Sequence, residues 1–157
     1  MSDSQRILDL TLDERTVVRR NPDIEQERRV AIYDLLQQNH FSPRGAPHGP
    51  YRLRLGIEPA GLAFDVRSES DLPLSRIVLA LSLFRHIMRD YFIVCDSYYE
   101  SIKSAPQSRI EAIDMGRRAM HTEAAELLVE KLKDRVELDL DTARRLFTLM
   151  CVLHRRA

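Results

Sequence analysis

Two stretches in the first half of the chain alternate apolar and polar residues, which is the pattern of a strand with one buried face. Leu8, Leu10 and Leu12 alternate with polar neighbours in residues 7–12. The same alternation runs through residues 51–57 and, after the turn 58–61, through residues 62–66. A period of two predicts β-strands. We therefore expect one strand and one hairpin. Their solvated face would carry Arg52, Arg54, Asp65 and Arg67, in water or in cross-strand ion pairs.

A helix is predicted between the first strand and the hairpin, over residues 22–39. Asn21 can cap its free amides, and Pro22 suits the first helical position. Ala31 and Leu35 would face the core. The following segment, residues 41–50, has three prolines and two glycines in ten residues, and we expect no regular element there.

In the second half the apolar residues recur every three or four positions, which is the period of an α-helix. Three helices are predicted: residues 73–103, residues 108–135, and a last one that begins at Asp139 or Asp141 and runs almost to the C-terminus. The first has two apolar stripes, so it should lie at the centre of the domain. Gly116, in mid-helix, costs about 1 kcal/mol relative to alanine, which suggests that another helix approaches closely there.

Together these elements predict a single α+β domain over residues 1–157. Residues 1–70 would supply a three-stranded antiparallel sheet and one helix, and residues 71–157 a C-terminal bundle of three helices against which they pack. The last two helical segments have more apolar positions than one packing partner requires. The surplus could contribute to the interface of a homodimer. It consists of Leu127, Leu128, Leu132, Leu138 and Leu140.

Composition narrows the class of protein. Hydrophobic residues make up 44%, which excludes intrinsic disorder, and 24 basic residues balance 24 acidic ones. A neutral chain has no general affinity for phosphate backbones, so we expect no nucleic-acid partner. The sequence has no secretory leader and no long apolar run, which favours a cytoplasmic protein that does not enter membranes. Cys95 and Cys151 lie in apolar helical patterns and should behave as small hydrophobic residues.

The first candidate for chemistry lies on the helix predicted over residues 73–103. His86 and Asp90 are four residues apart on one flank, and Asp96 follows further along. Asp90 could orient or stabilise the charge of His86, which would make His86 a general acid or base or a pH-sensitive contact. The alternative is a polar edge that meets solvent.

The second candidate lies on the last two helices. Asp114, Arg118 and His121 share one helix face, but one histidine supplies too few ligands for a metal site, and ion pairs of Arg117 and Arg118 explain the acidic residues more simply. Arg144 or Arg145 could hold an anionic ligand. Either arginine could instead clamp a carboxylate, for which the candidates are Asp96, Asp114 and Glu123.

Several stretches resemble a family of small alphaproteobacterial proteins that is catalogued as uncharacterised. They are DYFIVCDSYYESIK, IEAIDMGRRAMHTEAAELL, LDTARRLFTLMCVLHRR, LDLTLDE, NPDIEQERRVAIYDLL and PYRLRLGIE, and they span nearly the full length. The resemblance implies a one-domain cytoplasmic bacterial protein. It implies no activity, substrate or catalytic residue.

Two functions remain open. The sequence has no glycine-rich phosphate loop, no GxSxG, no CxxC and no HExxH, and it indicates no cofactor or metal. The leading hypothesis is therefore a non-catalytic interaction or regulatory protein that acts through its C-terminal helices, with a protein partner or a second copy. The rival is a small-molecule enzyme or ligand sensor with a His/Asp/Arg pocket between these helices. The deciding geometry is whether side-chain nitrogens and oxygens of three or more of the candidates approach within hydrogen-bond reach around a cavity. The candidates are His86, Asp90, Asp96, Asp114, Arg118, His121, Arg144 and Arg145.

Overall fold

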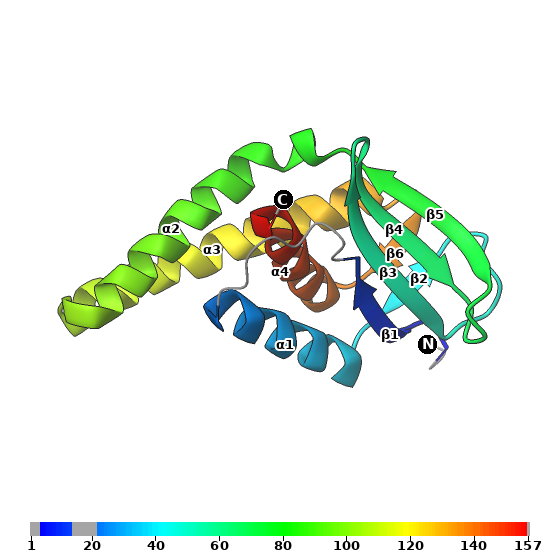
Figure 1. The fold of residues 1–157 in the computed structure, drawn as a ribbon, viewed down its shortest axis with the longest axis horizontal. Helices are drawn as coiled ribbons and strands as arrows, with labels where there is room; N and C mark the ends of the chain where they lie inside the picture. Colours follow the sequence, from blue (N-terminus) through cyan, green and yellow to red (C-terminus); the bar gives the residue numbers. More distant parts are fainter. Residues whose placement is uncertain (1–3, 14–21, 157) are drawn as a thin grey trace.

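The computed structural model describes residues 4–13 and 22–156 of the chain. It is an α+β structure in which the helices lie to one side of a mixed four-stranded sheet of order β1-β3-β4-β5 (Figure 1). The strands of this sheet are β1 (Ile7–Leu12), β3 (Tyr51–Glu58), β4 (Gly61–Arg67) and β5 (Pro73–Leu79). A second sheet pairs β2 (Phe41–Pro43) with β6 (Val136–Leu138). The helices are α1 (Pro22–Gln37), the short 3-10 helix η1 (Leu81–Leu83), α2 (Arg85–Ser104), α3 (Gln107–Leu132) and α4 (Leu140–Arg156).

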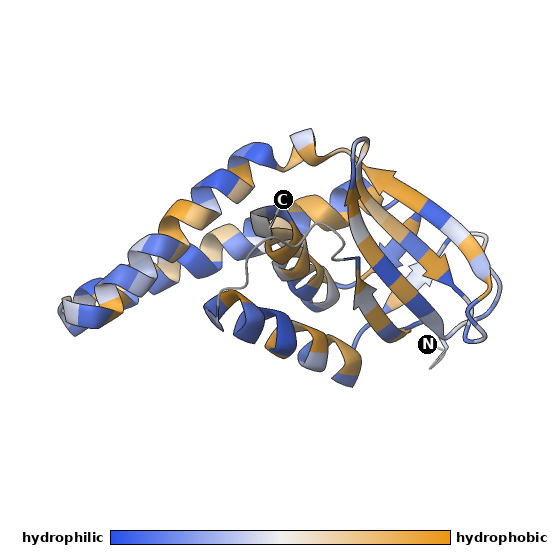
Figure 2. Ribbon diagram, viewed as in Figure 1, coloured by the Kyte–Doolittle hydropathy of each residue, from blue (hydrophilic) through white to orange (hydrophobic). Residues whose placement is uncertain are grey.

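The expected sheet differs from the structure in its number of strands and in one pairing. The sheet has four strands rather than three, and β1 pairs with β3 in parallel rather than antiparallel. The chain passes from β1 through α1 before it reaches β3, and a connection that contains a helix is the kind that joins parallel strands. The predicted hairpin of β3 and β4 is confirmed, with Leu53 opposite Val66 and Leu55 opposite Phe64. Apolar and polar residues alternate along these strands (Figure 2).

The fourth strand, β5, occupies residues that the sequence pattern assigned to the start of a helix. Ile77 and Leu79 are buried, whereas Arg76 and Val78, which precede each of them, are exposed, so the segment has a period of two once it pairs with β4. Pro73 can begin β5 because an edge strand leaves one row of amides unpaired. The central helix predicted over residues 73–103 is consequently shorter and begins at Arg85.

The short sheet of β2 and β6 also departs from expectation. Residues 41–50 were expected to hold no regular element, but Phe41–Pro43 pairs antiparallel with Val136–Leu138. Phe41 is fully buried, as are Val136 and Leu138, so this sheet closes one end of the core. The helix predicted over residues 108–135 ends at Leu132, before the chain enters β6.

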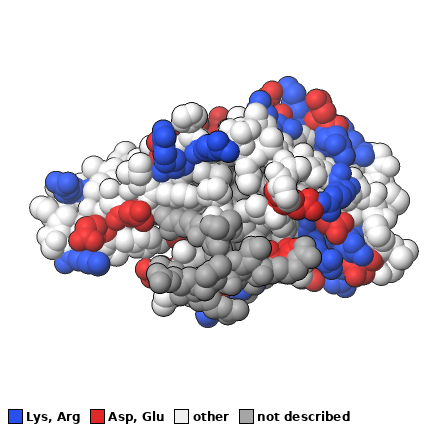
Figure 3. Space-filling model, turned by 45° about the horizontal axis from the view of Figure 1, so that its top comes forward, with Lys and Arg blue, Asp and Glu red and all other residues white. Residues whose placement is uncertain are grey.

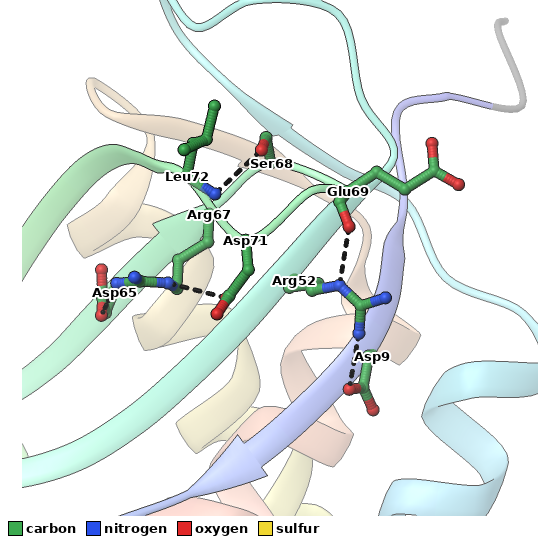
Figure 4. A network of polar contacts seen from close by, with 8 residues as sticks. All are labelled: Asp9, Arg52, Asp65, Arg67, Ser68, Glu69, Asp71 and Leu72. Atoms are coloured by element: carbon green, nitrogen blue, oxygen red, sulfur yellow. Dashed lines mark hydrogen bonds and ion pairs between the residues drawn. The ribbon is translucent and has the colours of Figure 1, made fainter.

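The outward face of the large sheet carries paired charges, as the sequence predicted. Arg52 Nη1 lies 3.1 Å from Asp9 Oδ2 on the neighbouring strand (Figure 4). Arg67 contacts Asp65 at 3.0 Å and Asp71 at 2.8 Å. On the face drawn in Figure 3, groups of both signs are interspersed over the sheet end of the molecule. Exposed pairs of this kind contribute little to stability, so we regard this face as a solvated surface.

Helix α4 lies between the other elements and contacts α1, α3 and β3. Its buried side is almost continuous from Ala143 to Leu153. Asp139 caps it, because its Oδ1 accepts a hydrogen bond from the Thr142 amide at 3.0 Å. α1 begins at Pro22 as predicted, and its expected cap Asn21 lies outside the described residues.

Most of the leucines expected at a dimer interface pack in or against the core of the chain itself. Leu128, Leu132 and Leu138 are buried in the core, Leu127 packs against it, and Leu140 is 37% exposed. Gly116 also differs from expectation, since no heavy atom outside its local helix would lie within 4 Å of an added Cβ. Among the described residues, Gly116 therefore marks no close helix contact, and it lines a hollow with Val94 and Ser97 of α2 instead. Cys95 and Cys151 are buried, as expected for small hydrophobic residues, and neither is in a disulfide within the described part of the chain.

Candidate functional site

A cavity of about 590 Å³ lies among the four long helices. Pockets of a few hundred cubic ångströms are the usual size for small-molecule sites. The basic groups of its lining come from α3 and α4, and they are Arg117, Arg118, His121, Arg144 and Arg145. Helical spacing explains the grouping, because residues 117, 118 and 121 share one face of α3 and residues 144, 145 and 148 share one face of α4.

His121 is the central histidine of this cavity. Its Nε2 lies 2.8 Å from the Thr148 hydroxyl. Its ring lies beside Tyr91 and Phe147, with centroid separations of 5.6 and 5.5 Å. Burial, followed by the positive charges of Arg144 and Arg117, lowers the pKa of His121 to about 4. The imidazole is therefore neutral near pH 7, and it serves as a hydrogen-bonding group rather than as a cation.

The two arginines of α3 share one carboxylate. Asp114 Oδ1 accepts hydrogen bonds from Arg117 Nε at 3.1 Å and Nη2 at 2.5 Å, and Asp114 Oδ2 lies 3.0 Å from Arg118 Nε. These contacts, led by the hydrogen bond from Arg117, lower the pKa of Asp114. The Arg117 guanidinium also lies 4.9 Å from the centre of the Tyr98 ring. The predicted intrahelical ion pairs are thus present, and Asp114 neutralises part of the positive charge of α3.

Arg144 and Arg145 of α4 have no such carboxylate among the described residues. Arg144 Nη2 donates to the Thr122 hydroxyl at 2.5 Å, and Arg145 Nη1 donates to the Asp141 carbonyl oxygen at 3.1 Å. The Nε atoms of both arginines are buried without a hydrogen-bond partner in the part of the chain that the structure describes. Neither arginine forms an ion pair with a carboxylate of residues 4–13 or 22–156, so the expected clamp on Asp96, Asp114 or Glu123 is absent there. Both arginines are partly buried, and a buried guanidinium N–H without an acceptor is costly, which makes these two the most unusual groups of the cavity.

Helix α1 supplies an opposite wall with acidic groups. Asp23, Glu27 and Asp34 line the cavity from this helix. Glu27 Oε1 accepts a hydrogen bond from the Tyr99 hydroxyl at 2.5 Å. Burial, followed by this hydrogen bond to Glu27, raises the pKa of Tyr99 above its ordinary value. The cavity therefore has an acidic wall on α1, a basic wall on α3 and α4, and tyrosines from α2 between them.

The structure brings together half of the candidate side chains. Arg118, His121, Arg144 and Arg145 line the cavity, and Asp114 lies beside it through its contacts with Arg117 and Arg118. Four candidates thus line one cavity, and the one direct contact between candidates among the described residues is that of Asp114 with Arg118.

The candidates on α2 lie elsewhere. His86 and Asp90 are exposed. His86 Nδ1 lies 3.2 Å from Arg89 Nη2, and Asp90 contacts the same arginine at 3.8 Å rather than orienting His86. Asp96 lines a different hollow between α2 and α3. These three residues take no part in the cavity.

Sequence patterns missed the acidic and aromatic members of the site. Nothing in the sequence predicts that Glu27 and Asp34 line a cavity with α4, so neither was a candidate. Tyr91 fits an apolar stripe of α2 and was not a candidate either. Thr148 lies four residues after Arg144, and this spacing was the one signal that could have suggested its place beside His121.

The described residues show neither a cluster of metal ligands nor a helix that could span a membrane. Within the described residues no group of three histidine, cysteine, aspartate or glutamate side chains is placed to hold a metal ion. No helix in that part of the chain combines the length and apolar character needed to cross a membrane.

Comparisons with known proteins place the chain in a family. A family model described as "Uncharacterised protein family (UPF0262)" matches residues 4–156. A UPF0262 protein of Sphingopyxis alaskensis is 53% identical over 154 residues, which cover 96% of this chain and 93% of that protein. One of Erythrobacter litoralis is 54% identical over 153 residues, with 95% and 96% covered, and one of Rhodospirillum rubrum is 50% identical over 156 residues, with 99% and 96% covered. No solved structure matches the chain. The resemblance noted from the sequence is confirmed by these matches over nearly the whole length, and the chain belongs to the UPF0262 family.

Proposed function

We propose that the chain is a small-molecule binding protein, and that its ligand places an anionic group against Arg144 and Arg145 in the cavity between α1, α2, α3 and α4. The observation that carries this proposal is the pair of buried Nε atoms without partners, on two arginines that have no carboxylate among the described residues. A carboxylate or phosphate group supplies the acceptors that these guanidinium groups lack, and arginine binds such groups with two parallel hydrogen bonds.

Binding without catalysis is the simpler role for this cavity. A histidine that acts as a base for a hydroxyl group normally has a third group to orient it. His121 contacts the Thr148 hydroxyl, but it forms no ion pair with a carboxylate of the described residues. We therefore assign His121 a hydrogen bond to the ligand or to Thr148, and we expect the protein to work as a ligand sensor in the cytoplasm. An interaction through the C-terminal leucines has less support, because three of the five lie in the core.

The experiment measures binding of defined anions to the purified chain. Inorganic phosphate, succinate and citrate are titrated by calorimetry at pH 7 and low salt, and the melting temperature is followed in parallel. We expect at least one of them to bind, and to stabilise the fold by about 2.7 kcal/mol when its concentration is 100 times the dissociation constant. Arg144→Gln and Arg145→Gln should each weaken that binding by about tenfold, the usual effect of losing one charge-assisted contact.

A matched control is available on α2. Arg89 is exposed and its contacts are to His86 and Asp90, so Arg89→Gln removes the same charge without touching the cavity. It should bind the anion as the wild-type chain does. An equal loss of anion affinity in Arg144→Gln, Arg145→Gln and Arg89→Gln would indicate an effect of net charge alone and would contradict the proposal. Failure of all three anions to bind would contradict it as well.

A further inference from the structure

The two walls of the cavity carry opposite charges. Every charged residue that α1 contributes to the lining is acidic, namely Asp23, Glu27 and Asp34. Every charged residue that α3 contributes is basic, and α4 adds Arg144 and Arg145 together with Asp141. We propose, on the basis of the function proposed above, that the ligand is amphoteric: it carries an anionic group for Arg144 and Arg145 and a cationic amine for the acidic wall of α1.

The acidic wall has groups that can receive an amine. Asp34 is half-buried, and it forms neither an ion pair nor a side-chain hydrogen bond within the described residues. Glu27 is engaged by the Tyr99 hydroxyl through Oε1, which leaves its second oxygen without a contact to Tyr99. Among the described residues, neither Glu27 nor Asp34 forms an ion pair with Arg144 or Arg145. These opposite charges therefore face each other across the cavity rather than neutralising each other by direct contact.

Electrostatics disfavours a ligand with charge of one sign. A simple anion would gain from the arginines and lose part of that gain to the carboxylates, because like charges repel. A simple cation would gain from the carboxylates of α1 and lose part of that gain to the arginines. A molecule with both charges gains from both walls. The rings of Tyr91, Tyr98 and Tyr99 provide an apolar lining between the walls, which suits a short methylene chain or a small ring.

The test uses a matched set of probes that differ only in charge. 6-Aminohexanoate carries both groups, hexanoate carries the anion alone and hexylamine carries the cation alone. 4-Aminobutanoate and 8-aminooctanoate, each with its own acid and amine, vary the distance between the charges. Phosphoethanolamine and phosphate repeat the comparison for a phosphate group. Calorimetry at pH 7 and low salt gives the affinity of each probe for the full chain.

We expect one amphoteric probe to bind at least tenfold more tightly than its matched anion and its matched amine. Asp34→Asn should reduce the ratio by which the amphoteric probe binds more tightly than its matched anion. The affinity for the anion alone should stay equal or rise. Arg144→Gln should weaken the binding of every probe that carries an acid. Asp90→Asn, which removes an exposed carboxylate on α2, serves as the matched control and should change none of these affinities.

The outcomes separate this inference from the proposed function. If anions bind through Arg144 and an added amine improves the affinity at no chain length, the ligand is not amphoteric and the inference is wrong, while anion binding stands. The inference is also wrong if Asp34→Asn leaves the advantage of the amine intact. If no acid binds, with or without an amine, both proposals are wrong.

Discussion

His121 lies between two arginines and two aromatic rings, and these neighbours keep it neutral. Burial and the charges of Arg144 and Arg117 lower its pKa to about 4, whereas a histidine in an unfolded chain titrates near 6.5. Protonating it in the folded protein would add a positive charge beside Arg117 and beside Arg144, which has no carboxylate partner among the described residues. Burial is the larger reason that His121 stays neutral, and the positive charges of the two arginines add to it.

The pH dependence of stability follows from this pKa. Below pH 6.5 the unfolded chain binds a proton at His121 that the folded chain does not bind, so the free energy of unfolding falls as the pH falls. The loss continues to about pH 4 and amounts to about 3 kcal/mol in total. His121→Gln keeps a group that can bond to Thr148 but cannot titrate. Urea denaturation at a series of pH values should show a smaller decrease between pH 6.5 and 4 in this variant.

Another histidine provides the control for that measurement. His86 is exposed on α2, so unfolding changes its surroundings little, and His86→Gln should show the same decrease with falling pH as the wild-type chain. If His121→Gln and His86→Gln have the same pH dependence, His121 is not the buried neutral group described above.

At the scale of elements, the sequence patterns predicted the strands that have a single period and missed β5, which fits two. Segments with a single period, such as β3 and β4, were predicted as they are. The β5 segment satisfies two periods at once: Leu74, Ile77, Val78 and Leu81 fit a helix, while Ile77 and Leu79 fit a strand. Pairing with β4 decides between them, and no residue of the segment itself encodes that partner. The same limit hid the short sheet, because Phe41 and Leu138 are 97 residues apart.

A glycine provides the test of where β5 lies. Gly61 has φ of +143°, and a Cβ added there would lie 2.2 Å from the carbonyl oxygen of Leu79 in β5. Gly61→Ala should therefore lower the free energy of unfolding by about 3 kcal/mol or more, the range of backbone strain combined with overpacking. Urea denaturation measures the change.

A second glycine shows what backbone conformation alone costs. Gly45 also has positive φ, at +73°, but no atom lies within 4 Å of an added Cβ. Gly45→Ala should cost about 1 kcal/mol. Equal costs for Gly45→Ala and Gly61→Ala would contradict the close approach of β5 to the β3–β4 turn.

Helical spacing predicted part of the candidate site. Asp114, Arg118 and His121 were grouped because they share one face of α3, and Arg144 was singled out because a cation lies among apolar residues on α4. The joining of these groups into one cavity depends on how α3, α4 and α1 pack. Periodicity says which side of a helix is buried, but it does not say which helix covers that side. Periodicity therefore could not predict that Glu27 and Asp34 line the cavity.

At the scale of the whole molecule, the fold separates two surfaces rich in charge. On the outer face of the sheet Arg52 and Arg67 have acidic partners, so this face is neutralised locally (Figure 4). In the cavity among the helices, the acidic wall of α1 and the arginines of α3 and α4 come from different helices. The net charge of zero for the whole chain does not reveal this difference. In the cavity, Arg144 and Arg145 have no carboxylate partner among the described residues.

The most direct measurement is a crystal structure of the chain soaked in sodium selenate, a tetrahedral oxyanion whose selenium can be located by its anomalous scattering. The account predicts an anomalous peak within hydrogen-bonding reach of the guanidinium groups of Arg144 and Arg145, in the cavity that His121 lines. Peaks confined to other surfaces, or density in which carboxylates of α1 bind both arginines directly, would contradict it.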